Sequence, residues 1–435
     1  MCDISKCLDD FFSSYMPSLS GSLRENRLER MNLLLGRLGH PERSFRTIHI
    51  AGSKGKGTTA TCLSFMLSSL GFRTGLFLSP HVYDIRERFT LSSSFFTDEE
   101  YLSALESLKK GIEGFELPSS LGCPLPTTFE LYTAYAYVLF SLTGCRWAVI
   151  ETGLGGRLDA TNTIESDAAV ITHIELEHTQ ILGSTLPLIA REKAGIMKKG
   201  KPVFVLGQSE EVLAVFRETA ASLPSSLSVF EMPPLDIDSG YRTREMEYLG
   251  ATLKMKTWKS DIRLTDAFFS IFILSRMGFP VEGRVFDLTS PLFHLPGRFE
   301  EREINGRTLL LDGAHTVNSV EYLSSALSQS PFSSRTLIFS TAQDKAWRDM
   351  LSVLVPLFDT VIVTSTGSWK KSYPEKIYED AVRMFPETEI EIILNHEEVI
   401  GRALEKTEEG GLITATGSFY LLGELEKVLR GKRWH

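Results

Sequence analysis

Short apolar runs alternate with segments of helical periodicity along the first half of the chain. The runs that predict strands are residues 47–51, 74–78, 147–151, 168–174 and 202–206. The patterns that predict helices are residues 59–70, 98–111, 129–141 and 186–197. Apolar strands separated by helices are typical of a mostly parallel sheet with right-handed crossovers. Residues 224–262 break the pattern with polar turns and short alternating runs, which predict an antiparallel edge or insert.

The alternation restarts after residues 291–296, which are expected to form a linker. Strands are predicted at residues 308–311, 336–340, 360–364, 390–394 and 411–416. Helices are predicted at residues 319–328, 347–357, 378–385, 399–406 and 420–430. The sequence therefore predicts an α/β protein with two domains, residues 1–290 and residues 297–435.

The first predicted strand leads into a glycine-rich loop, Gly52-Ser53-Lys54-Gly55-Lys56-Gly57-Thr58, which opens a helix. Glycines let backbone N–H groups converge on phosphate oxygens, and the helix N-terminus adds positive potential. Lys56 would supply a point charge and Thr58 a hydroxyl near a metal ion. The common phosphate-loop pattern has glycine where Ile50 stands and serine or threonine where Gly57 stands, so a tight basic turn is the alternative. We favour a nucleotide site, with ATP as the ligand.

Other polar residues of interest follow predicted strands, where ligands bind in parallel sheets. Glu151 ends one strand and is suited to Mg²⁺, which prefers oxygen ligands, although a solvated acid beginning a turn is the alternative. His173 and His178 follow the next strand, where a histidine is more often structural than a ligand. Lys193 lies in a charged segment that alone would predict a solvated helix face. If it were buried, its neutral amine could capture CO₂ as a carbamate.

Composition narrows the class of protein. The chain has 435 residues, of which 43% are hydrophobic and 23% charged, in the range of soluble globular proteins. Its formal net charge of −9 argues against a nucleic-acid surface. Apolar runs long enough to span a membrane and a secretory signal pattern are not found, so we expect a cytoplasmic protein without a membrane partner.

Several blocks, taken in order, resemble the folylpolyglutamate synthase and dihydrofolate synthase family of the Mur-ligase superfamily. They begin at residues 52–59, 79–81, 87–88, 128–130, 151–162 and 178–183. They continue at residues 190–196, 296–299, 312–315, 416–418 and 423–424. The resemblance implies an N-terminal phosphate-loop ATPase domain carrying the pterin or folate pocket, and a C-terminal Rossmann-like ligase domain on the glutamate side.

The resemblance also implies a reaction and its residues. An ATP-dependent carboxylate–amine ligase would add L-glutamate to dihydropteroate or folates through an acyl phosphate, releasing ADP and phosphate. Lys56, Lys193 and His178 would be catalytic. ATP would contact Gly52, Ser53, Lys54, Gly55, Lys56, Gly57, Thr58, Asp266, Arg298 and Asp312. Mg²⁺ would be held by Ser79, Glu151, His178 and a carbamylated Lys193. The substrates would contact Thr127, Thr128, Phe129, Glu130, Leu158, Asp159, Ala160, His315 and Ser418.

Some positions depart from the family pattern, and alternatives stay open. Lys54 and Asp266 stand where asparagine is usual, and Thr316-Val317 replace Asn-Pro beside the expected glutamate site. Another Mur-type ligase, acting on a nucleotide-linked (UDP) muramyl substrate, is one alternative. A nucleotide-binding module without ligase chemistry is the other. A monomer that acts only on small molecules is expected.

Overall fold

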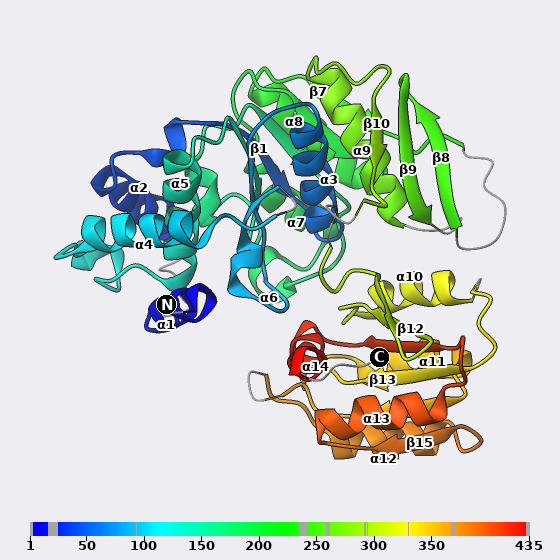
Figure 1. Cartoon of the computed structure of the whole chain (residues 1–435). Helices are drawn as coiled ribbons and strands as arrows, with labels where there is room; N and C mark the ends of the chain where they lie inside the picture. The colour runs from blue at the N-terminus through cyan, green and yellow to red at the C-terminus, as the bar shows by residue number, and fades with distance from the viewer. Residues whose placement is uncertain are drawn as a thin grey trace. The chain divides into compact units, whose positions relative to one another are not determined.

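The computed structural model describes residues 3–15, 25–92, 94–234, 242–257, 262–290, 293, 295–328, 330–367 and 370–431. The chain divides into two compact units (Figure 1). The first consists of Met1–Leu235, Arg244–Met255 and Arg263–His294, and the second consists chiefly of Leu295–His435. Each unit is built on its own sheet, and the predicted α/β fold class is confirmed. No helix in the described ranges is long and apolar enough to cross a membrane.

The first unit is organised around a seven-stranded sheet in the order β3-β2-β4-β1-β5-β6-β7. Its strands are β1 Arg46–Ala51, β2 Thr74–Phe77, β3 Phe89–Leu91, β4 Trp147–Glu151, β5 Ala168–Ile171, β6 Val203–Leu206 and β7 Leu227–Phe230. All neighbours pair in parallel except β3, which is antiparallel to β2. The five predicted strands are confirmed as β1, β2, β4, β5 and β6. Their side chains are almost all buried, as expected for a sheet covered on both faces.

Four predicted helices of the first unit are confirmed: α3 Lys56–Ser69, α4 Asp98–Ile112, α5 Thr128–Leu142 and α7 Leu186–Ala194. The unit also contains α1 Ile4–Ser13, α2 Arg27–Arg37, α6 Thr179–Leu182, α8 Glu210–Ser222 and α9 Ile262–Arg276. Short 3₁₀ turns are η2 Pro41–Arg43, η3 Ile85–Arg88, η4 Ser119–Leu121 and η5 Ala160–Thr163. Residues of α3 from Gly57 to Leu67 are all buried, so the helix behind the phosphate loop has no solvated face over this length.

Of the strands expected near residues 224–262, β7 extends the main sheet at its edge, in parallel to β6 and not antiparallel, and the others do not join that sheet. β8 Arg242–Tyr248, β9 Ala251–Thr257 and β10 Val285–Asp287 form a separate three-stranded sheet in the order β10-β9-β8. The predicted alternation is visible on β9, where Ala251, Leu253 and Met255 are buried and the residues between them are more exposed.

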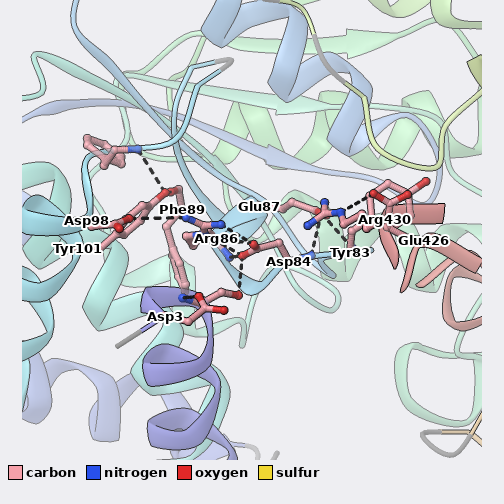
Figure 2. A network of polar contacts seen from close by, with 12 residues as sticks. Asp3, Tyr83, Asp84, Arg86, Glu87, Phe89, Asp98, Tyr101, Glu426 and Arg430 are labelled. Carbon is pink, nitrogen blue, oxygen red and sulfur yellow. Dashed lines mark hydrogen bonds and ion pairs between the residues drawn. The ribbon is translucent and has the colours of Figure 1, made fainter. Parts of the chain in front are cut away.

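A polar network ties α1 to the turn that follows β2 (Figure 2). The Asp84 carboxylate accepts hydrogen bonds from the Arg86 guanidinium at 2.7 Å and from the Ser5 hydroxyl at 2.9 Å. Burial alone would raise the pKa of Asp84, but the hydrogen bonds and charge of Arg86 lower it. The Glu87 carboxylate accepts hydrogen bonds from the backbone N–H groups of Val82 and Tyr83 and thereby fixes the turn.

The second unit has a six-stranded sheet in the order β11-β12-β16-β13-β14-β15. Its strands are β11 Glu300–Ile304, β12 Arg307–Leu311, β13 Arg335–Phe339, β14 Thr360–Val363, β15 Glu389–Ile392 and β16 Leu412–Thr416. Its helices are α10 Val317–Leu327, α11 Trp347–Leu354, α12 Pro374–Met384, α13 His396–Lys406 and α14 Phe419–Gly431, with the 3₁₀ turn η6 Val355–Leu357. Every predicted strand and helix of this half is confirmed. β11, the antiparallel edge strand, was not predicted.

Gly75 on β2 packs closely against a neighbouring aromatic ring, so a substitution there measures how tightly the first unit is packed. A Cβ atom there would lie 2.6–2.8 Å from three ring atoms of the fully buried Phe140. We expect Gly75→Ala to lower the free energy of unfolding by about 1–3 kcal/mol, because the ring has no space to move into. Gly36→Ala in α2 is the control, since its Cβ would meet only His40 at 3.8 Å or more. It is expected to be neutral or to stabilise by about 0.5–1 kcal/mol. Thermal denaturation of both variants is the measurement, and equal midpoints would contradict the prediction.

Candidate functional site

The phosphate loop is held in a conformation that glycine permits at two positions. Gly52 has φ of 149°, and a Cβ atom there would lie 1.9 Å from the Thr172 hydroxyl oxygen. Gly55 has φ of 82° and caps α3. The Ser53 N–H donates to the carbonyl of His173 at 2.8 Å, which ties the loop to the segment after β5. The Lys56 ammonium donates to the Gly52 carbonyl at 2.9 Å, so its charge lies over the loop.

Helix α9 contributes a carboxylate to this loop. Asp266 is 2% exposed and accepts a hydrogen bond from the Thr59 hydroxyl at 3.2 Å. A Cβ atom on Gly55 would lie 2.7 Å from an Asp266 carboxylate oxygen. The structure therefore brings Asp266, which the family resemblance had singled out, against the phosphate loop, although α9 itself was not predicted.

The carboxyl ends of β4 and β2 bring Glu151 and Ser79 together. The Ser79 N–H donates to Glu151 Oε2 at 3.1 Å, and the glutamate is 3% exposed. β4 lies between β1 and β2 in the sheet, so both residues are at the same sheet edge as the phosphate loop. Among the residues that the structure describes, no group of three or more His, Cys, Asp and Glu side chains is arranged to hold a metal ion. An oxygen-ligand site here would therefore need other donors beside Glu151.

Lys193 is buried beside a second lysine and one carboxylate. Its ammonium lies 2.7 Å from Glu177 Oε1, and the residue is 1% exposed. Burial, reinforced by the charge of Lys56, lowers the pKa of Lys193 to about 8, although Glu177 opposes the shift. Burial would raise the pKa of Glu177, but Lys56 and Lys193 together lower it. Glu177 stands where the family usually has aspartate, and the sequence did not assign it to the site; its contact with Lys193 distinguishes it here.

His178 is the N-cap residue of α6 and has φ of 45°, in the left-handed region that non-glycine residues rarely adopt. It stands one residue after Glu177 on the loop that follows β5. The strained backbone marks this loop as a place where the fold fixes one particular orientation. The structure thus places His178 on the same loop as the partner of Lys193.

The expected pocket wall at the start of α5 consists mostly of side chains that the fold itself uses. The Thr127 hydroxyl accepts from the Glu130 N–H at 3.3 Å, and Glu130 Oε2 accepts from the Thr127 N–H at 2.8 Å, which is a capping box. Glu130 also forms a buried ion pair with Arg30 at 2.9 Å. The Thr128 hydroxyl donates to the carbonyls of Phe12 and Tyr15.

Phe129 is the side chain of this wall that remains half-buried. A Cβ atom on Gly153 would lie 2.3 Å from the tip of its ring, so the glycine turn after β4 leaves room for the aromatic ring. Its centroid is 6.1 Å from that of Phe77. The arrangement gives the start of α5 a flat apolar surface next to the turn that follows Glu151.

Asp159 organises the loop that follows the glycine turn. It is fully buried and accepts hydrogen bonds from the Thr161 hydroxyl at 2.6 Å, the Thr161 N–H at 3.1 Å and the Leu154 N–H at 2.9 Å. Ala160 is also fully buried, and Leu158 is half-buried. The structure brings residues 158–160 beside the glycine turn, with Asp159 in a capping role.

In the second unit, the predicted residues gather at the carboxyl ends of β12 and β16, which are neighbours. Asp312 accepts from the Phe299 N–H at 2.8 Å and the Ala314 N–H at 2.9 Å. Arg298 donates to the Pro296 carbonyl at 3.2 Å. Ser418 is 4% exposed, and its hydroxyl accepts from the Tyr420 N–H at 3.1 Å.

Phe419 joins these residues and was missed by sequence reasoning. Its centroid lies 5.8 Å from that of His315, and the Arg298 guanidinium carbon lies 5.3 Å from it. A Cβ atom on Gly313 would lie 2.2 Å from the ring, so the ring packs directly on that glycine. An apolar residue at the start of an amphipathic helix predicts core packing, and the sequence carries no other signal of this role.

The chain is similar to known proteins over nearly its whole length. Residues 297–419 match the family model described as Mur ligase, glutamate ligase domain. The chain is 30% identical over 426 residues to the dihydrofolate synthase/folylpolyglutamate synthase of Bacillus subtilis, covering 93% of this chain and 95% of that protein. It is 30% identical over 436 residues to the dihydrofolate synthetase of Saccharomyces cerevisiae, covering 92% and 97%. The crystal structure of a folylpolyglutamate synthase from Thermotoga maritima is similar with a TM-score of 0.79, at 26% identity, covering 99% and 98%.

The lowered pKa of Lys193 makes a prediction about stability. A lysine whose pKa is about 8 in the folded protein, against an ordinary pKa of 10.5, binds fewer protons when folded. Between those two pKa values, unfolding takes up a proton. The free energy of unfolding should therefore rise with pH until the lysine is neutral in the unfolded state as well. Relative to Lys193→Met, the wild type should become more stable as pH is raised from 8 to 10, measured by urea unfolding. A constant difference between the two proteins across this range would contradict the prediction.

Proposed function

We propose that this chain, which belongs to the family of folylpolyglutamate synthases and dihydrofolate synthases, joins L-glutamate to dihydropteroate and to folates. It is an ATP-dependent ligase of the Mur type. The observation that carries the proposal is the arrangement of the phosphate loop, Glu151 with Ser79, and the Lys56–Glu177–Lys193 cluster along one sheet edge. The match over nearly the whole chain to a relative named for both activities supports acceptance of both acceptor substrates.

The reaction needs ATP because a carboxylate is a poor acyl donor at neutral pH. An oxygen of the acceptor's carboxylate attacks the γ-phosphorus of ATP, and the bond to the β-phosphate oxygen breaks, releasing ADP and leaving an acyl phosphate. The amine of glutamate then attacks the acyl carbon, loses a proton, and phosphate leaves with the electron pair of the C–O bond. Both steps build up negative charge on oxygens, which fixed positive groups stabilise.

We assign the phosphates of ATP to the loop from Gly52 to Thr58. The Lys56 ammonium already lies over the carbonyls of this loop, where it neutralises charge on the transferred phosphoryl group. The lysine that replaces asparagine at position 54 adds a further positive group near the loop. An ionised Asp266 accepts hydrogen bonds but cannot donate one, as the amide of an asparagine would. We therefore assign Asp266 to holding Thr59 and the loop.

The residues present fit Mg²⁺ in part. Glu151 and Ser79 offer oxygen donors, which a hard cation prefers, and His178 follows on the neighbouring loop. Mg²⁺ would supply charge neutralisation between the phosphates. The Lys193 amine, paired with Glu177, carries no oxygen and does not fit a cation as it stands. Its conversion to a carbamate would supply an anionic oxygen, and its lowered pKa leaves more neutral amine to react with CO₂.

Phe129 and the residues around Leu158 and Ala160 are assigned to the pterin ring. A half-buried aromatic side chain stacks well on a flat heterocycle, with ring contacts worth about 0.5–1.5 kcal/mol beyond burial. In the second unit, His315 and Ser418 are assigned to glutamate, and Arg298 and Asp312 to ATP. We expect the enzyme to act as a monomer in the cytoplasm, where ATP and glutamate are supplied.

Release of phosphate from ATP by the purified protein tests the proposed function. We expect release to require an acceptor, either dihydropteroate or tetrahydrofolate, together with L-glutamate. Omission of either substrate should reduce the rate to background, because the acyl phosphate needs both a carboxylate and an amine to turn over. Mass analysis of the product should show one added glutamate for each phosphate released.

Other outcomes would overturn or narrow the proposal. Phosphate release with a UDP-muramyl acceptor and no activity with pteroates would move the chain to another Mur-type branch. If the protein binds nucleotide but releases no phosphate with any acceptor, it would be a nucleotide-binding module without ligase activity. Activity with dihydropteroate alone would restrict the proposal to the first glutamylation.

Lys193→Ala tests the proposed carbamate. We expect the variant to lose activity by about 10²-fold or more, as for loss of a group that stabilises transition-state charge. Added acetate or formate should restore part of the rate, since a small carboxylate can occupy the space of the carbamate. Lys201→Ala is the control, because this half-buried lysine pairs with Asp167, which is assigned neither to a substrate nor to ATP. Full activity of Lys193→Ala without any additive would remove the carbamate from the mechanism.

A further inference from the structure

Arg30 of α2 is a fully buried arginine whose hydrogen bonds converge on one side of the first unit. Its Nε and Nη2 donate to the two carboxylate oxygens of Glu130 at 2.9 and 3.0 Å. Its Nη1 and Nη2 also donate to the carbonyls of Leu121, Cys123 and Leu125, at 3.2, 2.6 and 2.8 Å. One guanidinium thus connects α2, the segment before α5 and the first turn of α5.

This set of acceptors suits an arginine and no other side chain. The guanidinium presents five N–H donors in a planar fork, which can hold a carboxylate with two donors and still reach three carbonyls. The segment at residues 121–125 is not part of a helix or strand beyond the 3₁₀ turn η4, so its carbonyls need partners from elsewhere. Arg30 supplies them, and the conformation of this segment therefore depends on Arg30.

The first turn of α5 is tied to the same guanidinium through Glu130. Oε2 of Glu130 accepts from Arg30 and also from the Thr127 N–H, so one oxygen serves both the ion pair and the helix cap. Phe129, the neighbour of Glu130, places its ring over Gly153. A shift of the helix start would move this ring relative to the glycine turn.

We propose that Arg30 is a positioning residue for the acceptor substrate: through Glu130 and the segment at residues 121–125, it sets the place of Phe129 and thereby the affinity for the flat pterin end of the acceptor. Arg30 is itself fully buried and acts only through these neighbours. The inference rests on the proposed function, because it assigns Phe129 to the pterin ring.

Arg30→Met removes the donors and keeps a side chain of similar length. We expect KM for dihydropteroate and for tetrahydrofolate to rise about tenfold or more, since a displacement of the order of 1 Å in a positioning group has effects of this size or larger. KM for ATP and for glutamate should stay within about twofold, because their assigned residues lie on other loops. Steady-state kinetics with each substrate varied in turn is the measurement.

Arg30→Met also leaves Glu130 as a buried carboxylate without its counter-ion, which destabilises the fold. The double variant Arg30→Met with Glu130→Gln separates the two effects. Glutamine is neutral and can still accept from the Thr127 N–H, so the unfolding midpoint should recover relative to Arg30→Met. KM for the acceptor should remain raised, because the carbonyls of residues 121–125 are still unpaired. If Arg30→Met alone does not fold, the double variant decides the question.

Arg86→Met is the matched control. Arg86 forms a two-pronged ion pair with Asp84 in the same unit (Figure 2). Among the residues that the structure describes, its other ionic and ring contacts are with Asp98 and Phe95, neither of which is assigned to a substrate. We expect Arg86→Met to lower the unfolding midpoint and to leave every KM unchanged. A tenfold rise in its acceptor KM, an unchanged acceptor KM in Arg30→Met, or return of that KM to wild type in the double variant would each overturn the inference.

The wild-type assay distinguishes this inference from the proposed function. If the wild type shows no acceptor-dependent phosphate release, the proposed function fails before Arg30 is tested. If the wild type turns over and the Arg30 variants keep their acceptor KM, only the positioning role fails.

Discussion

The hydrogen-bonding of β1 to both β4 and β5 is the constraint on which the site in the first unit depends. The register pairs Ile50 with Glu151 and Ala51 with Ile171, so three strands end together. Backbone bonds continue past the strands, from the Thr152 N–H to Ile50 and from the Thr172 N–H to Ala51. The phosphate loop therefore leaves β1 between the glycine turn on one side and the segment leading to His178 on the other. Ligands bind at such sheet edges because the loops there diverge while their ends stay fixed.

The charges at this edge follow from the same placement. Lys56 and Lys193 both lower the pKa of Glu177, while Glu151 and Asp266 are further buried carboxylates at this edge and against the phosphate loop. Burial disfavours the charged form of Lys193, since an ammonium loses its hydration when it is removed from water. An anionic group beside Lys56 and Lys193 would offset this cost.

Much of the fold could be predicted because its strands are short, apolar and regularly separated by helices, as β1, β4 and β16 are. Helix α9 was not predicted. Buried residues such as Ala267, Phe268 and Phe269 follow one another along it, so the apolar stripe that identifies a surface helix is weak. The edge strands β3 and β11 escaped because pairing with a neighbour, and not local pattern, defines them. The sequence singled out the phosphate loop because it directly follows an apolar run, and Glu151 because it ends one. Glu177, Arg30 and Phe419 were not singled out, because their roles arise from partners far away in the sequence.

Two buried carboxylates in family-like blocks of the first unit use most of their hydrogen-bonding capacity on the protein itself. An ionised carboxylate has about four positions for accepting hydrogen bonds. Asp159 fills three of them with Thr161 and Leu154, and Glu130 fills three with Arg30 and Thr127. Such groups have little capacity left for a substrate without giving up a contact that holds their own loop. Both residues belong to blocks that resemble the family, and their chemistry is consistent with shaping the backbone. Discrimination between acceptor substrates would then come from the surface that they hold in place, of which Phe129 is the half-buried aromatic part.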